Sequence, residues 1–90
     1  MESETVEVMD LYLAAYYLVQ GCAIEEVRNI PAGKNAACSL LIRGNRERMR
    51  EATEAFFASS AEVNLLDFRH AYNRVNTAIH QAKRNAGGRV

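Results

Sequence analysis

The stretch from Asp10 to Gly21 carries the strongest hydrophobic signal in the sequence. It reads DLYLAAYYLVQG, so that an unbroken run of apolar and aromatic residues separates Asp10 from Gln20. A helix at the surface of a globular protein has one apolar stripe, whereas this one would be apolar around its whole circumference. We therefore predict a short helix that is buried on several sides, with Gly21 as the residue that ends it.

Two shorter apolar patterns follow, on either side of the turn-rich segment IPAGKN. Residues 22–30 and 36–44 are typical of two strands, and a loop of roughly five residues would join them as an antiparallel β-hairpin. Imperfect alternation in the first strand predicts a bulge near Glu25–Glu26. The TVEV segment at residues 5–8 is compatible with a short third strand.

Two helices are predicted in the second half of the chain. The segment NRERMREATEAFFASS begins at Gly44 or Asn45 and is amphipathic. A longer helix follows Asn64, which is a favourable N-cap residue, and it extends to Arg84. The apolar side chains that fall on one side of these helices are Met49, Ala52 and Phe56 in the first, and Leu65, Phe68, Ala71, Tyr72, Val75, Ala78, Ile79 and Ala82 in the second.

This order of elements predicts an α+β fold: an N-terminal helix, an antiparallel β-hairpin, and two helices packed on one face of the small sheet. Ninety residues are enough for one domain. We assign that domain to residues 9–84, with residues 1–8 as an N-terminal extension or short strand and residues 85–90 as a flexible tail.

Charge is balanced overall but arranged in blocks. Residues 1–30 carry six acids and one base, residues 31–50 five bases and one acid, residues 51–67 four acids, and residues 68–90 five bases. Such blocks can pair within one chain or between chains. The acidic N-terminus and the shortness of the apolar run predict a cytoplasmic protein without a signal peptide and without membrane association.

Candidate catalytic residues are few. His70 and His80 both fall on the polar side of the last helix, and there is no glycine-rich phosphate-binding loop. A hairpin turn near Gly33 would place Cys38 opposite Arg28 and far from Cys22, so core or half-buried thiols are expected rather than a disulfide. The cysteines and histidines also lack the spacing of a zinc site. We therefore predict no enzymatic activity, no cofactor and no metal.

Three tyrosines on the first helix raise the question of what covers them. Tyr12 and Tyr16 fall on one side and Tyr17 on another, which is more aromatic surface than a small monomer is expected to bury. One interpretation leaves a tyrosine at the surface with its hydroxyl in water. The other, which we favour, is a homodimer interface that includes Tyr12, Tyr16 and Tyr17 or joins sheet edges.

The stretch RGNRERMR at residues 43–50 has an unexpected charge pattern. Arg46, Arg48 and Arg50 would lie in the first turns of a helix, where the helix dipole disfavours cations. Ion pairs along the helix offer an ordinary explanation: Arg50 with Glu47 and with Glu54, and Arg48 with Glu51. The functional alternative is an anion site at the helix start that uses Arg43, Arg46, Arg50 and Lys34.

Two blocks of sequence carry a resemblance to a known family. The first comprises Asp10, Leu11, Leu13, Ala14, Ala15, Tyr16 and Gly21, and the second Phe56, Phe57, Val63, Asn64 and Phe68. In their order and spacing they resemble domain of unknown function 5659, a group of short prokaryotic and phage-borne proteins. The resemblance covers roughly residues 8–82, and the chain departs from the family pattern at FFASSAEV and in a longer, more polar hairpin loop. It implies the same order of elements and no catalytic residues.

These observations lead to two hypotheses about function. The first is a small non-catalytic interaction protein, homodimeric, with the accessory or host-modulating role that a phage-borne family suggests, exerted by binding an unidentified protein. The alternative is an anion-binding module for nucleic acid or a nucleotide that uses the arginine-rich helix start at residues 43–50.

Overall fold

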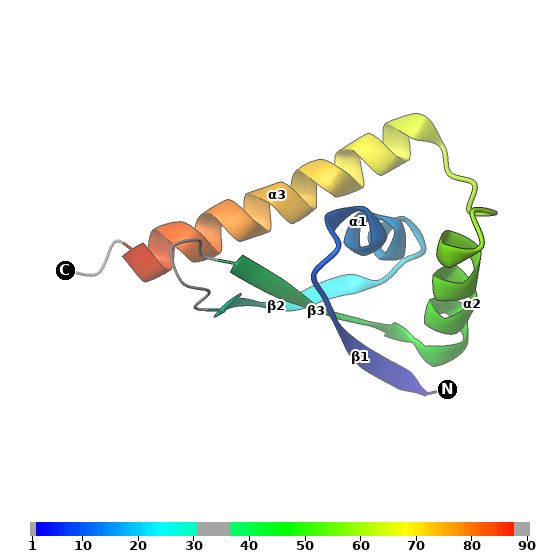
Figure 1. Ribbon diagram of the computed structural model, residues 1–90, viewed down its shortest axis with the longest axis horizontal. Helices are drawn as coiled ribbons and strands as arrows, with labels where there is room; N and C mark the ends of the chain where they lie inside the picture. The colour runs from blue at the N-terminus through cyan, green and yellow to red at the C-terminus, as the bar shows by residue number, and fades with distance from the viewer. Residues whose placement is uncertain (1, 31–36, 88–90) are drawn as a thin grey trace.

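The structure, a computed structural model, describes residues 2–30 and 37–87. It is a small α+β fold in which helices pack against a three-stranded antiparallel sheet (Figure 1). The elements in chain order are β1 (Ser3–Val8), α1 (Leu11–Val19), β2 (Ala23–Ile30), β3 (Ala37–Asn45), α2 (Arg46–Phe57) and α3 (Leu65–Gly87).

The sheet has β3 at its centre, with β1 and β2 antiparallel on either side. The TVEV segment is therefore part of a strand that pairs with β3 rather than an extension. The bulge in β2 is confirmed, because the register changes between Ile24 and Glu26. Between the bulge and the loop, each β3 residue therefore pairs with the β2 residue one position later than predicted. Cys38 accordingly lies opposite Asn29 and not opposite Arg28.

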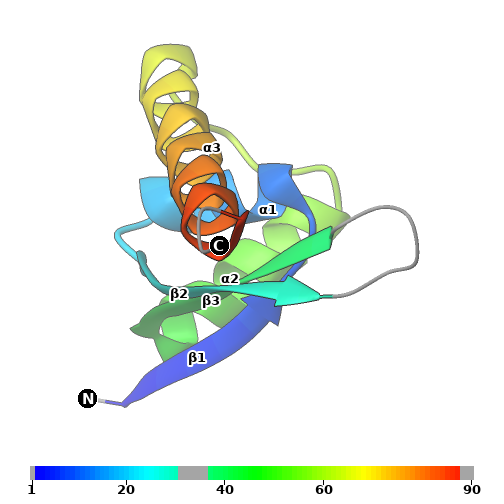
Figure 2. The same ribbon diagram turned by 90° about the vertical axis from the view of Figure 1, so that its left-hand side faces the viewer.

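Helix α1 is buried around most of its circumference, as the sequence predicted. Every residue from Leu13 to Leu18 is buried. The reason is that α1 contacts all five of the other elements: the sheet lies on one side, α3 crosses it on the other, and α2 stands at one end (Figures 1 and 2). Asp10 caps its start by accepting from the backbone N–H groups of Tyr12 and Leu13, and Gly21 ends it with a φ of 96°.

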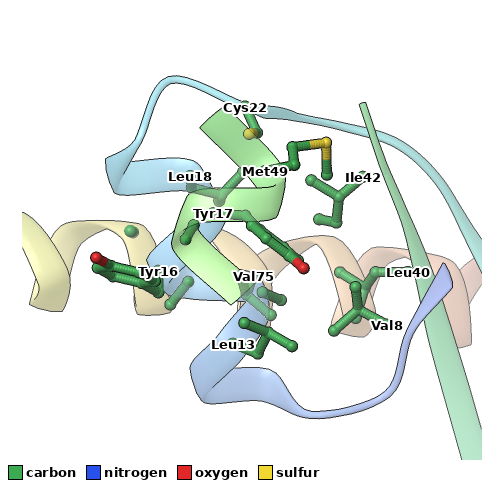
Figure 3. Close-up of a cluster of buried hydrophobic side chains, with 14 residues drawn as sticks. Val8, Leu13, Tyr16, Tyr17, Leu18, Cys22, Leu40, Ile42, Met49 and Val75 are labelled. Carbon is green, nitrogen blue, oxygen red and sulfur yellow. The ribbon is translucent and has the colours of Figure 1, made fainter. Parts of the chain in front are cut away.

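The centre of the core joins the sheet to all three helices. Leu40 and Ile42 of β3, Met49 of α2 and Val75 of α3 are almost fully buried. Figure 3 shows these side chains converging with those of α1. Because β3 is the central strand, its inward-facing side chains are covered by helices from both halves of the chain.

Helix α3 departs from its predicted burial at its first turn. Ala71 and Val75 are buried, and Phe68, Tyr72 and Ile79 pack on the core while partly exposed. Leu65, which was expected in the buried stripe, is instead 82% exposed. Figure 1 shows the reason: α3 rises away from the sheet and α1 toward its N-terminal end.

The predicted helix starts are confirmed. The side chain of Asn45 accepts from the backbone N–H of Arg48, and that of Asn64 accepts from the N–H of Asp67, both at 3.0 Å. Helix α3 continues to Gly87, past the predicted end at Arg84, and residues 88–90 of the predicted tail lie outside the described residues.

Candidate interaction surface

The three tyrosines of α1 have different environments. Tyr16 is 7% exposed and Tyr17 3% exposed, so a single chain covers two of the three tyrosines that were expected at a dimer interface. Tyr17 reaches Thr53 of α2, and Tyr16 packs against Phe56 of the same helix. Helix α2 is thus the partner that sequence reasoning missed, because nothing in the pattern of α1 identifies which distant helix lies beside it.

Tyr12 is the tyrosine that remains at the surface, with 57% of its area exposed. Its ring stacks on two aromatic rings of α3: the centroids lie 6.4 Å from Phe68 and 5.4 Å from Tyr72. Phe68 and Tyr72 are themselves stacked. Leu65 precedes them on α3 at helical spacings of three and seven residues, which places it on the same side. The exposed leucine and the three rings therefore form one apolar surface.

This surface continues along α3 toward its C-terminal end. A shallow cavity of about 300 Å³ lies there, and it is lined by Met9, Leu11, Cys38, Ile79 and Lys83. Leu11 is next to Tyr12 in α1, and Ile79 lies two turns after Tyr72 in α3, so the cavity adjoins the aromatic stack. We call the combined surface the apolar face; its residues are Met9, Leu11, Tyr12, Cys38, Leu65, Phe68, Tyr72 and Ile79.

A second group of exposed apolar side chains surrounds the connection from α2 to α3. Phe57 is 70% exposed, Leu66 55% and Val63 38%. Phe57 meets Phe56 edge to face, with ring centroids 5.3 Å apart. Phe57 had been singled out in the sequence only as part of a family motif, and it falls outside the apolar side of the helix that holds Met49, Ala52 and Phe56.

The arginines at the start of α2 are held by carboxylates of the same chain. Arg46 contacts Glu2 at 2.6 Å and Glu4 at 3.3 Å, both from the β1 end of the chain. Its backbone N–H also donates to the carbonyl of Glu2, at 3.1 Å. With the N–H of Arg48 capped by Asn45, two of the backbone donors that an anion would need are already engaged.

Arg50 and Arg43 are also paired. Arg50 lies 3.1 Å from Glu47 and 3.3 Å from Glu54, as the sequence predicted, and its hydrogen bond to Glu47 together with both charges raises the pKa of the guanidinium. Arg43 lies 3.5 Å from Glu25. The structure therefore gives each of Arg43, Arg46 and Arg50 its own carboxylate, while Lys34 lies outside the described residues.

The Arg48 side chain contacts a backbone carbonyl instead of a carboxylate. It donates to the backbone carbonyl of Gln20 at 3.5 Å, and the expected pair with Glu51 is not among the ion pairs of the described residues. Arg48 also influences Cys22, which is buried and free. Burial raises the pKa of the Cys22 thiol, and the charge of Arg48 opposes that shift. Cys38, the other cysteine, is half-buried.

Within residues 2–30 and 37–87, no helix combines the length and the apolar character that crossing a membrane requires. In the same ranges no three His, Cys, Asp or Glu side chains are grouped so as to hold a metal ion.

Comparison with family models, with curated proteins and with solved structures found no match for this chain. The resemblance to domain of unknown function 5659 therefore rests on its sequence motifs and stays a prediction. Interpretation of function depends on the surfaces described above.

Proposed function

We propose that this protein is a small, non-catalytic interaction protein that works as a homodimer, and that the apolar face is where two copies meet. The observation that supports this most directly is the Tyr12–Phe68–Tyr72 stack with Leu65 beside it. Exposed apolar surfaces that gather side chains in this way mark interaction sites more often than isolated exposed residues do.

The composition of the apolar face favours a second copy of the chain as its occupant. Among the described residues that line the cavity, Lys83 at its edge is the one with a charge. A partner chosen by opposite charge therefore has little to recognise, whereas an uncharged apolar surface is complementary to itself. A twofold axis brings the same surface of both copies together and closes the assembly. Tyr12 suits such an interface because its ring is apolar and its hydroxyl can stay in water.

The biological role that we propose follows from the family resemblance: an accessory or host-modulating role, in a phage or another mobile element, through binding of a further protein. The anion-binding alternative at residues 43–50 has less support. Arg43, Arg46 and Arg50 each contact a carboxylate of their own chain, so an arriving anion would have to displace these contacts.

The homodimer is tested by light scattering after size exclusion at low micromolar concentration. We expect about twice the chain mass of 10.1 kDa. Leu65→Glu and Tyr12→Glu should each give the monomer mass, because each places a charge in the apolar face. Leu66→Glu is the matched control, since Leu66 is also exposed but lies on another side of α3.

Two results would contradict the proposal. A mass near 10.1 kDa for the unaltered chain would show that no dimer forms. A dimer that Leu66→Glu disrupts as strongly as Leu65→Glu would show that the copies meet elsewhere, and the α2–α3 connection would then be the surface to examine.

A further inference from the structure

The side of α3 that faces away from the core is polar and carries arginines. Figure 1 shows α3 along the upper edge of the molecule, with α1 and the sheet below it. Its outward residues recur at helical spacing on the side opposite Ala71 and Val75. We call them the outer face of α3: Leu66, Arg69, His70, Asn73, Thr77, His80 and Arg84, all exposed.

Charge on this helix is unbalanced. After Asp67 in its first turn, α3 carries no acidic residue as far as Gly87. Its cations are Arg69, Arg74, Lys83 and Arg84. In the described part of the chain, Arg28, Arg43, Arg46 and Arg50 each form an ion pair with a glutamate, whereas none of the four cations of α3 does. The overall net charge of zero conceals this separation.

We propose that the outer face of α3 binds double-stranded DNA. Arginine side chains can contact phosphates and the edges of guanine, and asparagine, threonine and histidine between them can donate and accept hydrogen bonds to bases and phosphates. An α-helix fits the major groove of B-form DNA. Helix α3 has 23 residues, so it is about 34 Å long, which is close to one turn of the duplex.

Two other anionic partners fit the outer face less well. A membrane surface would be matched by several exposed apolar residues beside the cations, whereas Leu66 lies at the start of this face and Asn73, Thr77 and His80 occupy its middle. Double-stranded RNA has a deep, narrow major groove that does not admit a helix. The row of polar residues between Arg69 and Arg84 argues against a membrane and the groove geometry argues against duplex RNA, so DNA is the partner that fits best.

This inference is independent of the proposed homodimer, because it uses a different side of α3. The apolar face includes Leu65, Phe68 and Tyr72, whereas the outer face includes Asn73 and Thr77. Disruption of the dimer by Leu65→Glu would not remove the cations of the outer face, and neutralising Arg69 and Arg84 would not alter the apolar face.

The test is fluorescence anisotropy of a labelled DNA duplex of about 20 base pairs, titrated with the full chain at several salt concentrations. We expect binding whose affinity falls with salt, with a log–log slope of about −2 for phosphate contacts by Arg69 and Arg84. Arg69→Gln with Arg84→Gln should weaken binding at least tenfold. Arg84→Gln alone is the second variant, and it should weaken binding several-fold.

The matched control is Arg28→Gln with Arg43→Gln, which removes the same charge from two exposed arginines of the sheet. It should change the affinity less than twofold, and all variants should melt cooperatively near the temperature of the unaltered chain. Three results would overturn the inference: no binding at about 50 mM salt, equal losses in the two double variants, or binding to anionic lipid vesicles or to duplex RNA in preference to DNA.

Discussion

The hydroxyl oxygen of Tyr17 in α1 lies 2.5 Å from that of Thr53 in α2. The Thr53 hydroxyl is also 2.7 Å from the carbonyl of Met49, to which it donates its single hydrogen. Tyr17 is therefore the donor in the contact between the two helices. This hydrogen bond connects α1 to α2, and its two residues are 36 positions apart in the chain.

We expect Tyr17→Phe to lower the free energy of unfolding by about 1 kcal/mol, because it removes one intramolecular hydrogen bond. Thr53→Val should lower it more, by about 1–3 kcal/mol. Tyr17 is almost fully buried, and this substitution leaves its hydroxyl group without a hydrogen-bond acceptor. Denaturant unfolding of both variants and of the double variant checks this. The double variant should lose less than the sum of the two; strictly additive losses would mean that water replaces Thr53.

Gly44 has no room for a side chain. A Cβ at this position would overlap the Sγ of Cys22 and lie 3.1 Å from its Cβ. We expect Gly44→Ala to lower the free energy of unfolding by about 1–3 kcal/mol, because Cys22 is buried and has little space to move. The same substitution in a Cys22→Ala background should cost less. An equal cost in both backgrounds, measured by denaturant unfolding, would show that this contact is not the cause.

Cys22 should make stability depend on pH in the alkaline range. Burial raises the pKa of its thiol above the ordinary value of 9.0 in the folded state. The unfolded chain therefore loses this proton at lower pH, and the contribution of Cys22 to stability is present in full below pH 9 and lost as the pH rises above it. The free energy of unfolding should fall more steeply there for the unaltered chain than for Cys22→Ala. If the free energies of unfolding of the two proteins fall in parallel above pH 9, Cys22 is not the cause of the pH dependence.

Val75 is expected to be the most sensitive position on α3. It is fully buried, so Val75→Asp places a charge where it has no partner, at a cost of several kcal/mol against a total stability of about 5–10 kcal/mol. This variant should not show a cooperative melt by circular dichroism. Ile79→Asp should still melt cooperatively at a lower temperature, because Ile79 is partly exposed and its replacement can reach water. Equal behaviour of the two variants would mean that the core is centred elsewhere.

Features that depend on neighbouring residues could be read from the sequence. The caps at Asn45 and Asn64, the end of α1 at Gly21 and the bulge in β2 each follow from a residue type or a spacing within a few positions. The uninterrupted apolar run in α1 likewise indicated burial on most sides, because no orientation of such a helix leaves it a polar face. In the same way, the ion pairs of Arg50 follow from helical spacing alone.

What only the tertiary structure decided is which distant segments meet. The sequence placed Tyr12, Tyr16 and Tyr17 together as candidate interface residues, but the packing of α2 against α1 buries two of them and leaves Tyr12 to stack on α3. It marked Arg46 as a candidate anion ligand, but the pairing of β1 with β3 brings Glu2 and Glu4 to it. Local patterns determine how a segment folds and which side it buries, whereas partners far apart in the chain are selected by the packing of the whole domain.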